Sequence, residues 1–167
     1  GLTVTCSAVW AQTASNPNIN AQLLVAARQA DLSAIERSLA RGAAPNSRNR
    51  LGKTALLIAA EKGHTAMFAR MLAAGADVNL ASLDGVTPLM AAAYGGHADI
   101  TQKLLAAGAR AEPADRMKKT AVIYAAGQGH AKVLSMLLDR GVPIDAAYEQ
   151  QLTALMWAAG QGHSDAV

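Results

Sequence analysis

Apolar residues recur along this chain at helical spacing, in short stretches that glycine residues separate. One stretch runs over residues 54–63 and opens with Thr54, whose hydroxyl suits the N-cap of a helix. A second stretch over residues 64–75 ends at Gly75, which suits the left-handed residue that closes a helix. The pattern therefore predicts two short helices, followed by a polar turn or hairpin over residues 77–86. The apolar positions of the two helices are Leu56, Ala59, Ala60, Met67, Met71 and Leu72.

This unit of two helices and a turn repeats with a period of 33 residues. A fixed period of this kind is the signature of repeat architectures, in which each unit buries its apolar face against the next. The alanine pair in each first helix allows neighbouring helices to approach closely. The matching positions are Thr54, Thr87, Thr120 and Thr153; the alanine pairs that begin at Ala59, Ala92, Ala125 and Ala158; the Gly-His pairs that begin at Gly63, Gly96, Gly129 and Gly162; and Gly75, Gly108 and Gly141.

The segment from Leu83 to His97 resembles an ankyrin repeat, whose usual signature is T-P-L-H-x-A followed by G-H and L-L-x-x-G-A. The resemblance covers residues 20–167, with about five repeats of which the last is incomplete. It implies an all-α ankyrin-repeat solenoid of stacked helix-turn-helix units with short hairpin connections. The segment 153–159 resembles bacterial ankyrin-repeat proteins, and together with the N-terminal segment described below it makes the chain similar to exported, periplasmic members of that group.

The sequence departs from the ankyrin pattern at several positions. The first unit lacks the capping threonine and the Gly-His pair, as expected of a terminal repeat that faces water. Lys118 and Gln151 stand where earlier units have the hairpin glycines Gly52 and Gly85, so we expect these two hairpins to be less regular. Apolar residues replace the signature histidine at Leu57, Met90, Ile123 and Met156. The residues that suit the capping role are Arg28, Gln29, Glu36, Arg37 and Arg41.

Residues 1–19 form a separate N-terminal segment. This segment carries no charged residue, and the first charged residue of the chain is Arg28. Its apolar stretch ends in small residues at Val9 and Ala11 and resembles the back half of a secretory signal peptide, cut after Ala11 or Ala14. The basic front region of a signal is missing, so a disordered leader is the alternative. A signal peptide predicts a periplasmic or secreted protein, whereas a mere tail predicts a cytoplasmic one.

Composition narrows the class of protein further. Apolar residues make up 51% of the chain and charged residues 16%, which excludes a disordered chain. The net charge of +3 and the pI near 9.3 lie below what dedicated nucleic-acid binders carry, so we expect no nucleic-acid partner. The single cysteine excludes an intrachain disulfide framework and a cysteine-rich zinc site. No apolar run approaches the roughly 18 residues that span a bilayer, so we expect no membrane insertion of the mature chain.

The sequence shows no catalytic constellation. Its four histidines occupy one column of the repeat, and stacked helices lie roughly 8–10 Å apart, whereas the ligands of a zinc ion must approach it to about 2.0–2.1 Å. They are therefore predicted to be structural histidines at the helix junctions. No phosphate-binding glycine motif is present. We expect a chain that is not an enzyme, with no metal, no cofactor and no small-molecule substrate. The histidines are His64, His97, His130 and His163.

Function in a solenoid resides in the residues displayed on its surface. The resemblance implies that an unidentified partner protein binds the hairpin tips and the concave helix face, with Tyr94 and Met117 as anchors because aromatic residues and methionine are enriched in interface cores. The alternatives are an intracellular or host-directed ankyrin scaffold, or an accessory module of an enzyme encoded in missing sequence. The candidate contact residues are Arg50, Leu51, Lys53, Glu61, Lys62, Leu83, Asp84, Val86, Tyr94, Arg116, Met117, Lys119, Gln128, Glu149, Gln150 and Gln161.

Two further groups of residues have both a structural and a functional interpretation. Tyr124 and Trp157 fit packing between repeats better than stacking on a ligand. Basic residues cluster in the polar turns, either as solvated hairpin tips or as a weakly positive rim for an acidic partner. These basic residues are Arg48, Arg50, Lys53, Arg116, Lys118 and Lys119.

The last unit stops at Val167, where its second helix has barely begun. We therefore expect the chain to be a fragment of a longer protein. An uncapped solenoid end is prone to associate or to fray, so we expect self-association or faster hydrogen exchange over residues 146–167.

Overall fold

The structure is a computed structural model that describes residues 17–142. Within these residues the chain forms eight α-helices and no strand. Predictions about the leader and about the end of the chain lie outside the described residues, apart from residues 17–19. The helices are α1 (Pro17–Gln29), α2 (Leu32–Ala40), α3 (Ala55–Lys62), α4 (Thr65–Ala73), α5 (Pro88–Gly95), α6 (Ala98–Ala106), α7 (Ala121–Gly127) and α8 (Ala131–Leu138).

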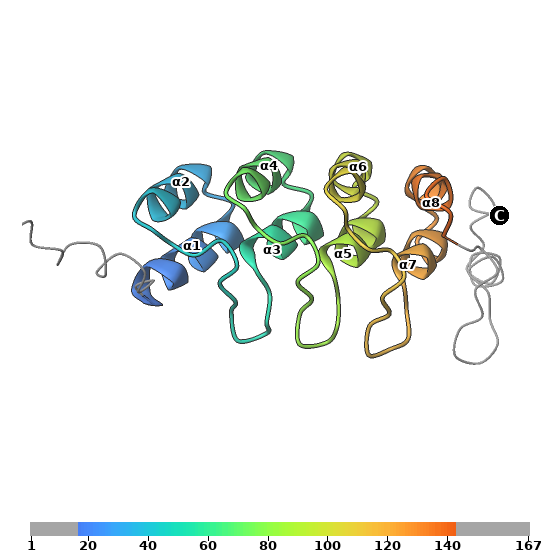
Figure 1. Cartoon of the computed structure of the whole chain (residues 1–167), viewed down its shortest axis with the longest axis horizontal. Helices are drawn as coiled ribbons and strands as arrows, with labels where there is room; N and C mark the ends of the chain where they lie inside the picture. The colour runs from blue at the N-terminus through green and yellow to red at the C-terminus, as the bar shows by residue number, and fades with distance from the viewer. Residues whose placement is uncertain (1–16, 143–167) are drawn as a thin grey trace, which may run out of the picture.

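The helices form a row of stacked pairs (Figure 1). The first helices of the pairs, α1, α3, α5 and α7, pack successively against one another, and the second helices α2, α4, α6 and α8 form a parallel row. The loops that join one pair to the next project together beyond the row of first helices (Figure 1). This arrangement confirms the predicted all-α fold built from repeated helical pairs.

Threonine residues begin two of the first helices, as the sequence predicts. The Thr54 hydroxyl accepts a hydrogen bond from the N–H of Leu57 at 3.2 Å, and the Thr87 hydroxyl accepts one from the N–H of Met90 at the same distance. Both threonines are buried, so these bonds satisfy backbone N–H groups that water could not reach. Thr120 occupies the same N-cap position before α7.

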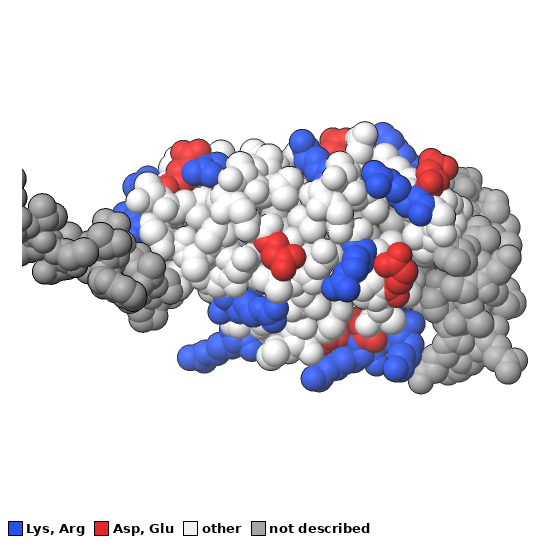
Figure 2. All heavy atoms as spheres, viewed as in Figure 1, with Lys and Arg blue, Asp and Glu red and all other residues white. Residues whose placement is uncertain are grey.

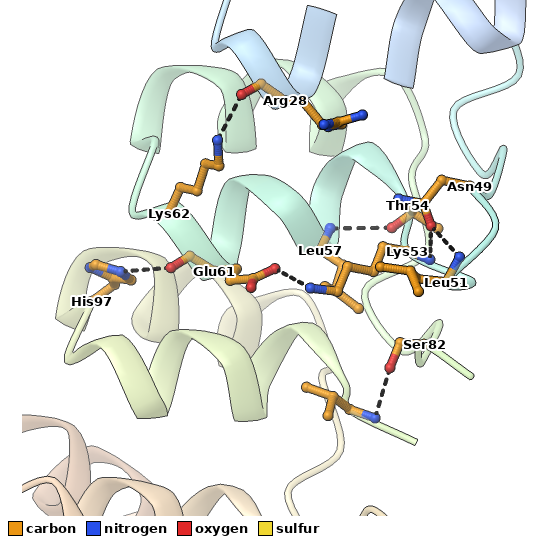
Figure 3. Close-up of polar contacts among 11 residues, drawn as sticks. Arg28, Asn49, Leu51, Lys53, Thr54, Leu57, Glu61, Lys62, Ser82 and His97 are labelled. Atoms are coloured by element: carbon orange, nitrogen blue, oxygen red, sulfur yellow. Dashed lines mark hydrogen bonds and ion pairs between the residues drawn. The ribbon is translucent and has the colours of Figure 1, made fainter. Parts of the chain in front are cut away.

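A Gly-His pair joins the first helix to the second in the three described repeats after the first, and its histidine also links neighbouring repeats. The ring of His97 lies with Nε2 3.3 Å from the carbonyl oxygen of Glu61 (Figure 3). His130 Nε2 lies 2.9 Å from the carbonyl oxygen of Tyr94 in the same way. A Cβ on Gly63, whose φ is +73°, would stand 2.5 Å from the His97 ring. Glycine is therefore required there for both its backbone angle and its lack of a side chain. The prediction of structural junction histidines is confirmed for these two residues.

Small side chains form much of the core, as the alanine pairs predict. Ala92 and Ala93 are fully buried between neighbouring helices, and Phe68 is the largest of the fully buried side chains of the described residues. Helix α1 begins at Pro17, inside the segment predicted as a leader, and Ile19 packs in the core. None of the described helices is long and apolar enough to cross a membrane.

Candidate functional site

Three loop ends project side by side from the row of first helices, and we call them the hairpin tips (Figure 1). They comprise residues 49–53, 82–86 and 115–119. In each tip the N–H of the first residue donates to the carbonyl of the last, at 3.0, 2.9 and 3.0 Å respectively. The third tip contains Lys118 and is as regular as the others, so the expectation of a less regular hairpin there was wrong. Gln151 lies outside the described residues.

The side chain of the first residue holds each tip in shape. The Asn49 Oδ1 accepts hydrogen bonds from the N–H groups two and four residues later, at 2.9 and 3.0 Å (Figure 3). The Asp115 Oδ1 accepts the equivalent pair at 2.8 and 2.9 Å, and the Ser82 Oγ accepts from the N–H four residues later at 3.3 Å. Sequence analysis did not identify these three residues, which occupy the same position of successive repeats. A short polar residue that begins a tight turn is the signal that could have found it.

The tips are also bonded to one another. The N–H of Leu83 donates to the carbonyl of Leu51 at 3.0 Å, and the N–H of Arg116 donates to the carbonyl of Asp84 at 2.9 Å. Each tip is therefore fixed in register with the next, and the three tips form a continuous edge with one step per repeat.

Lys118 holds a left-handed backbone conformation with φ of +61°, at the position that glycine occupies in the first two tips. That region costs a residue with a Cβ roughly 1–2 kcal/mol, whereas glycine loses about 0.4–1 kcal/mol in unfolded-state entropy. Lys118→Gly is therefore expected to raise the free energy of unfolding by about 0.5 kcal/mol, measured by urea denaturation.

A matched pair of variants checks this expectation for Lys118. Ala30, with φ of +58°, should respond to Ala30→Gly in the same direction. Gly85→Ala should destabilise, because φ is +81° and the new Cβ would stand 3.2 Å from the Cα of Asp115. A clear loss of stability in Lys118→Gly would show that the lysine side chain makes a contribution larger than its backbone strain.

Large apolar side chains gather on the tips and next to them. Leu51 is 60% exposed, Leu83 59%, Met117 63% and Tyr94 55%. These four, together with Val25, make up five of the six large apolar side chains that are exposed within residues 17–142. The sixth belongs to α2, which is in the other row of helices.

Two grooves lie beside the tips. The central groove has a volume of about 240 Å³, and the N-terminal groove about 870 Å³. We call the tips and these two grooves together the tip-and-groove surface. The central groove is lined by Lys53, Leu57, Glu61, Ser82, Asp84, Val86, Met90, Ala91, Tyr94 and Tyr124. The N-terminal groove is lined by Asn20, Ala21, Leu24, Val25, Arg28, Ser47, Arg48, Asn49, Arg50 and Leu51.

An ion pair and an aromatic pair both line the central groove. Lys53 Nζ lies 2.8 Å from Glu61 Oε2 (Figure 3), with both side chains partly exposed, so the pair adds little stability. The rings of Tyr94 and Tyr124 meet edge to face, with centroids 5.7 Å apart and planes at 85°. Tyr124 therefore packs against the preceding repeat, as predicted, while Trp157 lies outside the described residues.

The carboxylate of Asp115 connects the third tip to this aromatic pair. Its Oδ2 accepts a hydrogen bond from the Tyr124 hydroxyl, while its Oδ1 holds the tip. Lys119 Nζ lies 5.7 Å from the centroid of the Tyr124 ring, which places a cation over its face. One buried acidic residue, Asp115, therefore helps to position the third tip, Tyr124 in the groove wall and the backbone of Lys119.

Burial raises the pKa of Tyr124 above its ordinary value of about 10, and the hydrogen bond and charge of Asp115 raise that pKa further, with a smaller contribution from Tyr94. The unfolded chain therefore loses this proton at a lower pH than the folded chain. Stability that depends on the neutral phenol is present below about pH 10 and falls as the pH rises above it.

We expect the free energy of unfolding to fall more steeply between about pH 10 and 11.5 in the wild type than in Tyr124→Phe, which has no phenol to titrate. Denaturant titrations at a series of pH values measure both slopes. Equal slopes would show that Tyr124 does not couple folding to pH.

The structure brings most of the predicted contact residues together. Those that line a groove are Arg50, Leu51, Lys53, Glu61, Asp84, Val86 and Tyr94. Those that lie on the tips without lining a groove are Leu83, Arg116, Met117 and Lys119. Two others lie at helix ends and line neither groove. Gln128 is the C-cap of α7, and Lys62 Nζ donates to the carbonyl of Arg28 at 2.7 Å, which links α3 to α1 (Figure 3). The predicted residues outside the described part are Glu149, Gln150 and Gln161.

Several groove residues were not among the predicted contacts. Leu57 and Met90 stand where the signature histidine was noted as replaced, and the structure places both against the central groove. Val25 and Arg28 line the N-terminal groove, although the sequence suggested only a capping role for Arg28. By the 33-residue period, these residues are equivalent to groove-lining residues of other repeats. This equivalence is the signal that could have found them.

The described residues contain no group of three or more histidine, cysteine, aspartate or glutamate side chains that could hold a metal ion. The arrangement offers hydrogen-bonding groups, exposed apolar side chains and cations on a rigid edge. These are the features of a recognition surface.

Comparison with known proteins agrees with the geometry. A family model for ankyrin repeats in three copies matches residues 23–115 and 109–167. A search of curated proteins finds no significant match. Ankyrin repeats are generally protein–protein interaction modules and are typically not enzymes. The helical pairs, the bonded tips and the family match together show that this chain belongs to the ankyrin-repeat family.

Proposed function

We propose that this chain binds a partner protein through the tip-and-groove surface. The observation that carries the proposal is that five of the six exposed large apolar side chains of residues 17–142 lie there. Contiguous exposed apolar side chains with polar surroundings mark interaction sites on soluble proteins. Tyrosine, methionine and arginine, which this surface displays at Tyr94, Met117 and Arg50, are enriched in interfaces.

The rigidity of the surface supports the same proposal. Each tip is closed by its own backbone bond, held by a side-chain acceptor and bonded to the neighbouring tip. A surface that is ordered before binding loses less conformational entropy when a partner docks. The tips can therefore present Leu51, Leu83 and Met117 to a partner at fixed spacing.

The test uses capture from an extract of the native host by the immobilised chain. The variant carries Leu51→Ser, Leu83→Ser and Met117→Ser, and the control carries Leu32→Ser on α2, which is also an exposed apolar position. We expect a partner that the wild type and the control retain and that the triple variant loses. Equal retention by all three chains would contradict the proposal, provided that circular dichroism shows all of them folded.

We further propose that the protein is exported to the bacterial periplasm. The support is the pattern of residues 1–14, an uncharged apolar stretch that ends in small residues before a polar segment. N-terminal sequencing of the protein from its native host tests this proposal. A mature chain that begins near Gln12 is the expected result, and a cytoplasmic chain that retains residues 1–11 would contradict it.

A further inference from the structure

We propose that the partner segment is an extended acidic peptide that lies across the three hairpin tips, with acidic residues at the two outer tips and an apolar residue at the middle one. This inference rests on the proposed function and specifies the chemistry of the partner.

Charge is distributed unevenly along the edge of tips. The middle tip carries one charged residue, Asp84. The first and third tips are basic, and Figure 2 shows groups of basic side chains along the edge where the hairpins lie. The cations on or beside the first tip are Arg48, Arg50 and Lys53, and those on the third are Arg116, Lys118 and Lys119.

Several of these cations are available to a ligand. Within the described part of the chain, no hydrogen bond or ion pair involves the side chains of Arg50, Arg116 or Lys118. All three are exposed. The neighbouring Asp115 is buried and accepts hydrogen bonds from its own tip and from Tyr124, so it is not free to pair with them.

The repeat spacing sets the spacing of the peptide's charges. Neighbouring stacked helices lie roughly 8–10 Å apart, so the two basic tips, two repeats apart, are separated by about 16–20 Å. An extended chain advances about 3.3 Å per residue, and it therefore covers this distance in about five or six residues. An acidic residue between the two ends would meet Asp84, whereas an apolar residue would meet Leu83.

A peptide fits this surface better than an anionic membrane or a nucleic acid. Both of those present negative charge continuously, so they would place some of it opposite Asp84. A flat bilayer touching the tips would also leave the central groove and Tyr94 unoccupied. An extended peptide can turn a side chain toward the groove while its charges pair with the outer tips.

The test measures binding of fluorescein-labelled peptides to the full chain by fluorescence anisotropy, at low ionic strength. One peptide carries acidic pairs six residues apart around a central leucine. A second peptide of the same composition has the acidic residues at its centre. We expect the first to bind at least about tenfold more tightly.

A charge-matched pair of variants locates the binding site. The tip variant carries Arg50→Gln, Arg116→Gln and Lys118→Gln, and the control carries Arg37→Gln, Lys103→Gln and Lys132→Gln on α2, α6 and α8. We expect the tip variant to bind the first peptide about tenfold more weakly and the control to bind it within about twofold of the wild type.

Three results would overturn the inference. They are no binding of either peptide up to about 1 mM, equal binding of both peptides, and equal weakening by both variants. Phosphatidylserine vesicles or duplex DNA that bind more tightly than the first peptide, with loss in the tip variant, would assign the tips to those ligands instead. Failure of this inference can be distinguished from failure of the proposed function. A captured partner that depends on the apolar tip residues but not on the tip cations would keep that function and overturn only the acidic peptide.

Discussion

Replacing Asp115 with alanine is expected to lower the free energy of unfolding by about 3 kcal/mol. This carboxylate is 5% exposed and accepts hydrogen bonds from the N–H groups of Met117 and Lys119 and from the hydroxyl of Tyr124. Hydrogen bonds to a charged acceptor contribute roughly 1.5–3 kcal/mol each. Because water can reach some of the released donors, the expected loss is less than the sum for three such bonds.

Urea denaturation measures the free energy of unfolding of Asp115→Ala, and two further variants serve to interpret the result. Asp84→Ala removes an exposed carboxylate from the middle tip and should change stability by less than about 0.5 kcal/mol. Asp115→Asn keeps an oxygen that can accept from the tip and should recover part of the loss. If Asp115→Ala were no more destabilising than Asp84→Ala, the third tip would not depend on its buried carboxylate.

Tyr94→Ala is expected to weaken partner binding roughly 30-fold, which corresponds to about 2 kcal/mol. Tyr94 is half exposed and belongs to the wall of the central groove, so its ring is available to a partner. The folded chain should lose only the edge-to-face contact with Tyr124, which contributes about 0.5–1.5 kcal/mol.

Calorimetric titration with the captured partner and thermal denaturation of the free chain separate these two effects. Tyr94→Phe keeps the ring pair and should bind within a few-fold of the wild type. Unchanged affinity in Tyr94→Ala together with a sharply lower melting temperature would show that Tyr94 is a packing residue rather than a contact.

Much of the fold could be predicted because its signals are local and recur from one repeat to the next after the first. Thr54 and Thr87 cap helices through bonds to residues three positions later, and Gly63 ends α3 in the left-handed conformation. Each signal involves a few neighbouring residues, so a 33-residue period is enough to align them. The alanine pairs of the described repeats are all buried, because each occupies the same position of its repeat.

The candidate site was only partly predictable, because its organisation depends on contacts between residues from different repeats or different elements. One local contact was also missed: Lys118 was expected to disturb its hairpin, but Asp115 of the same tip holds the backbone on both sides of it. The link from Lys62 to the carbonyl of Arg28 spans two repeats, and no local pattern reveals it. The bond from Tyr124 to Asp115 likewise joins a helix to a tip and needs the folded geometry.

Site-specific photocrosslinking in the native host tests the partner-binding surface most directly. A photoreactive phenylalanine analogue is placed at Leu83 on the middle tip and at Tyr94 in the central groove, and, as controls, at Leu32 on α2 and Gln102 on α6. All four side chains are exposed, so each position can present the photoreactive group to a partner. We predict that Leu83 and Tyr94 form a covalent adduct with the same partner and that Leu32 and Gln102 form none. An adduct at Leu32 or Gln102, with none at Leu83 and Tyr94, would contradict the assignment of the tip-and-groove surface as the binding site.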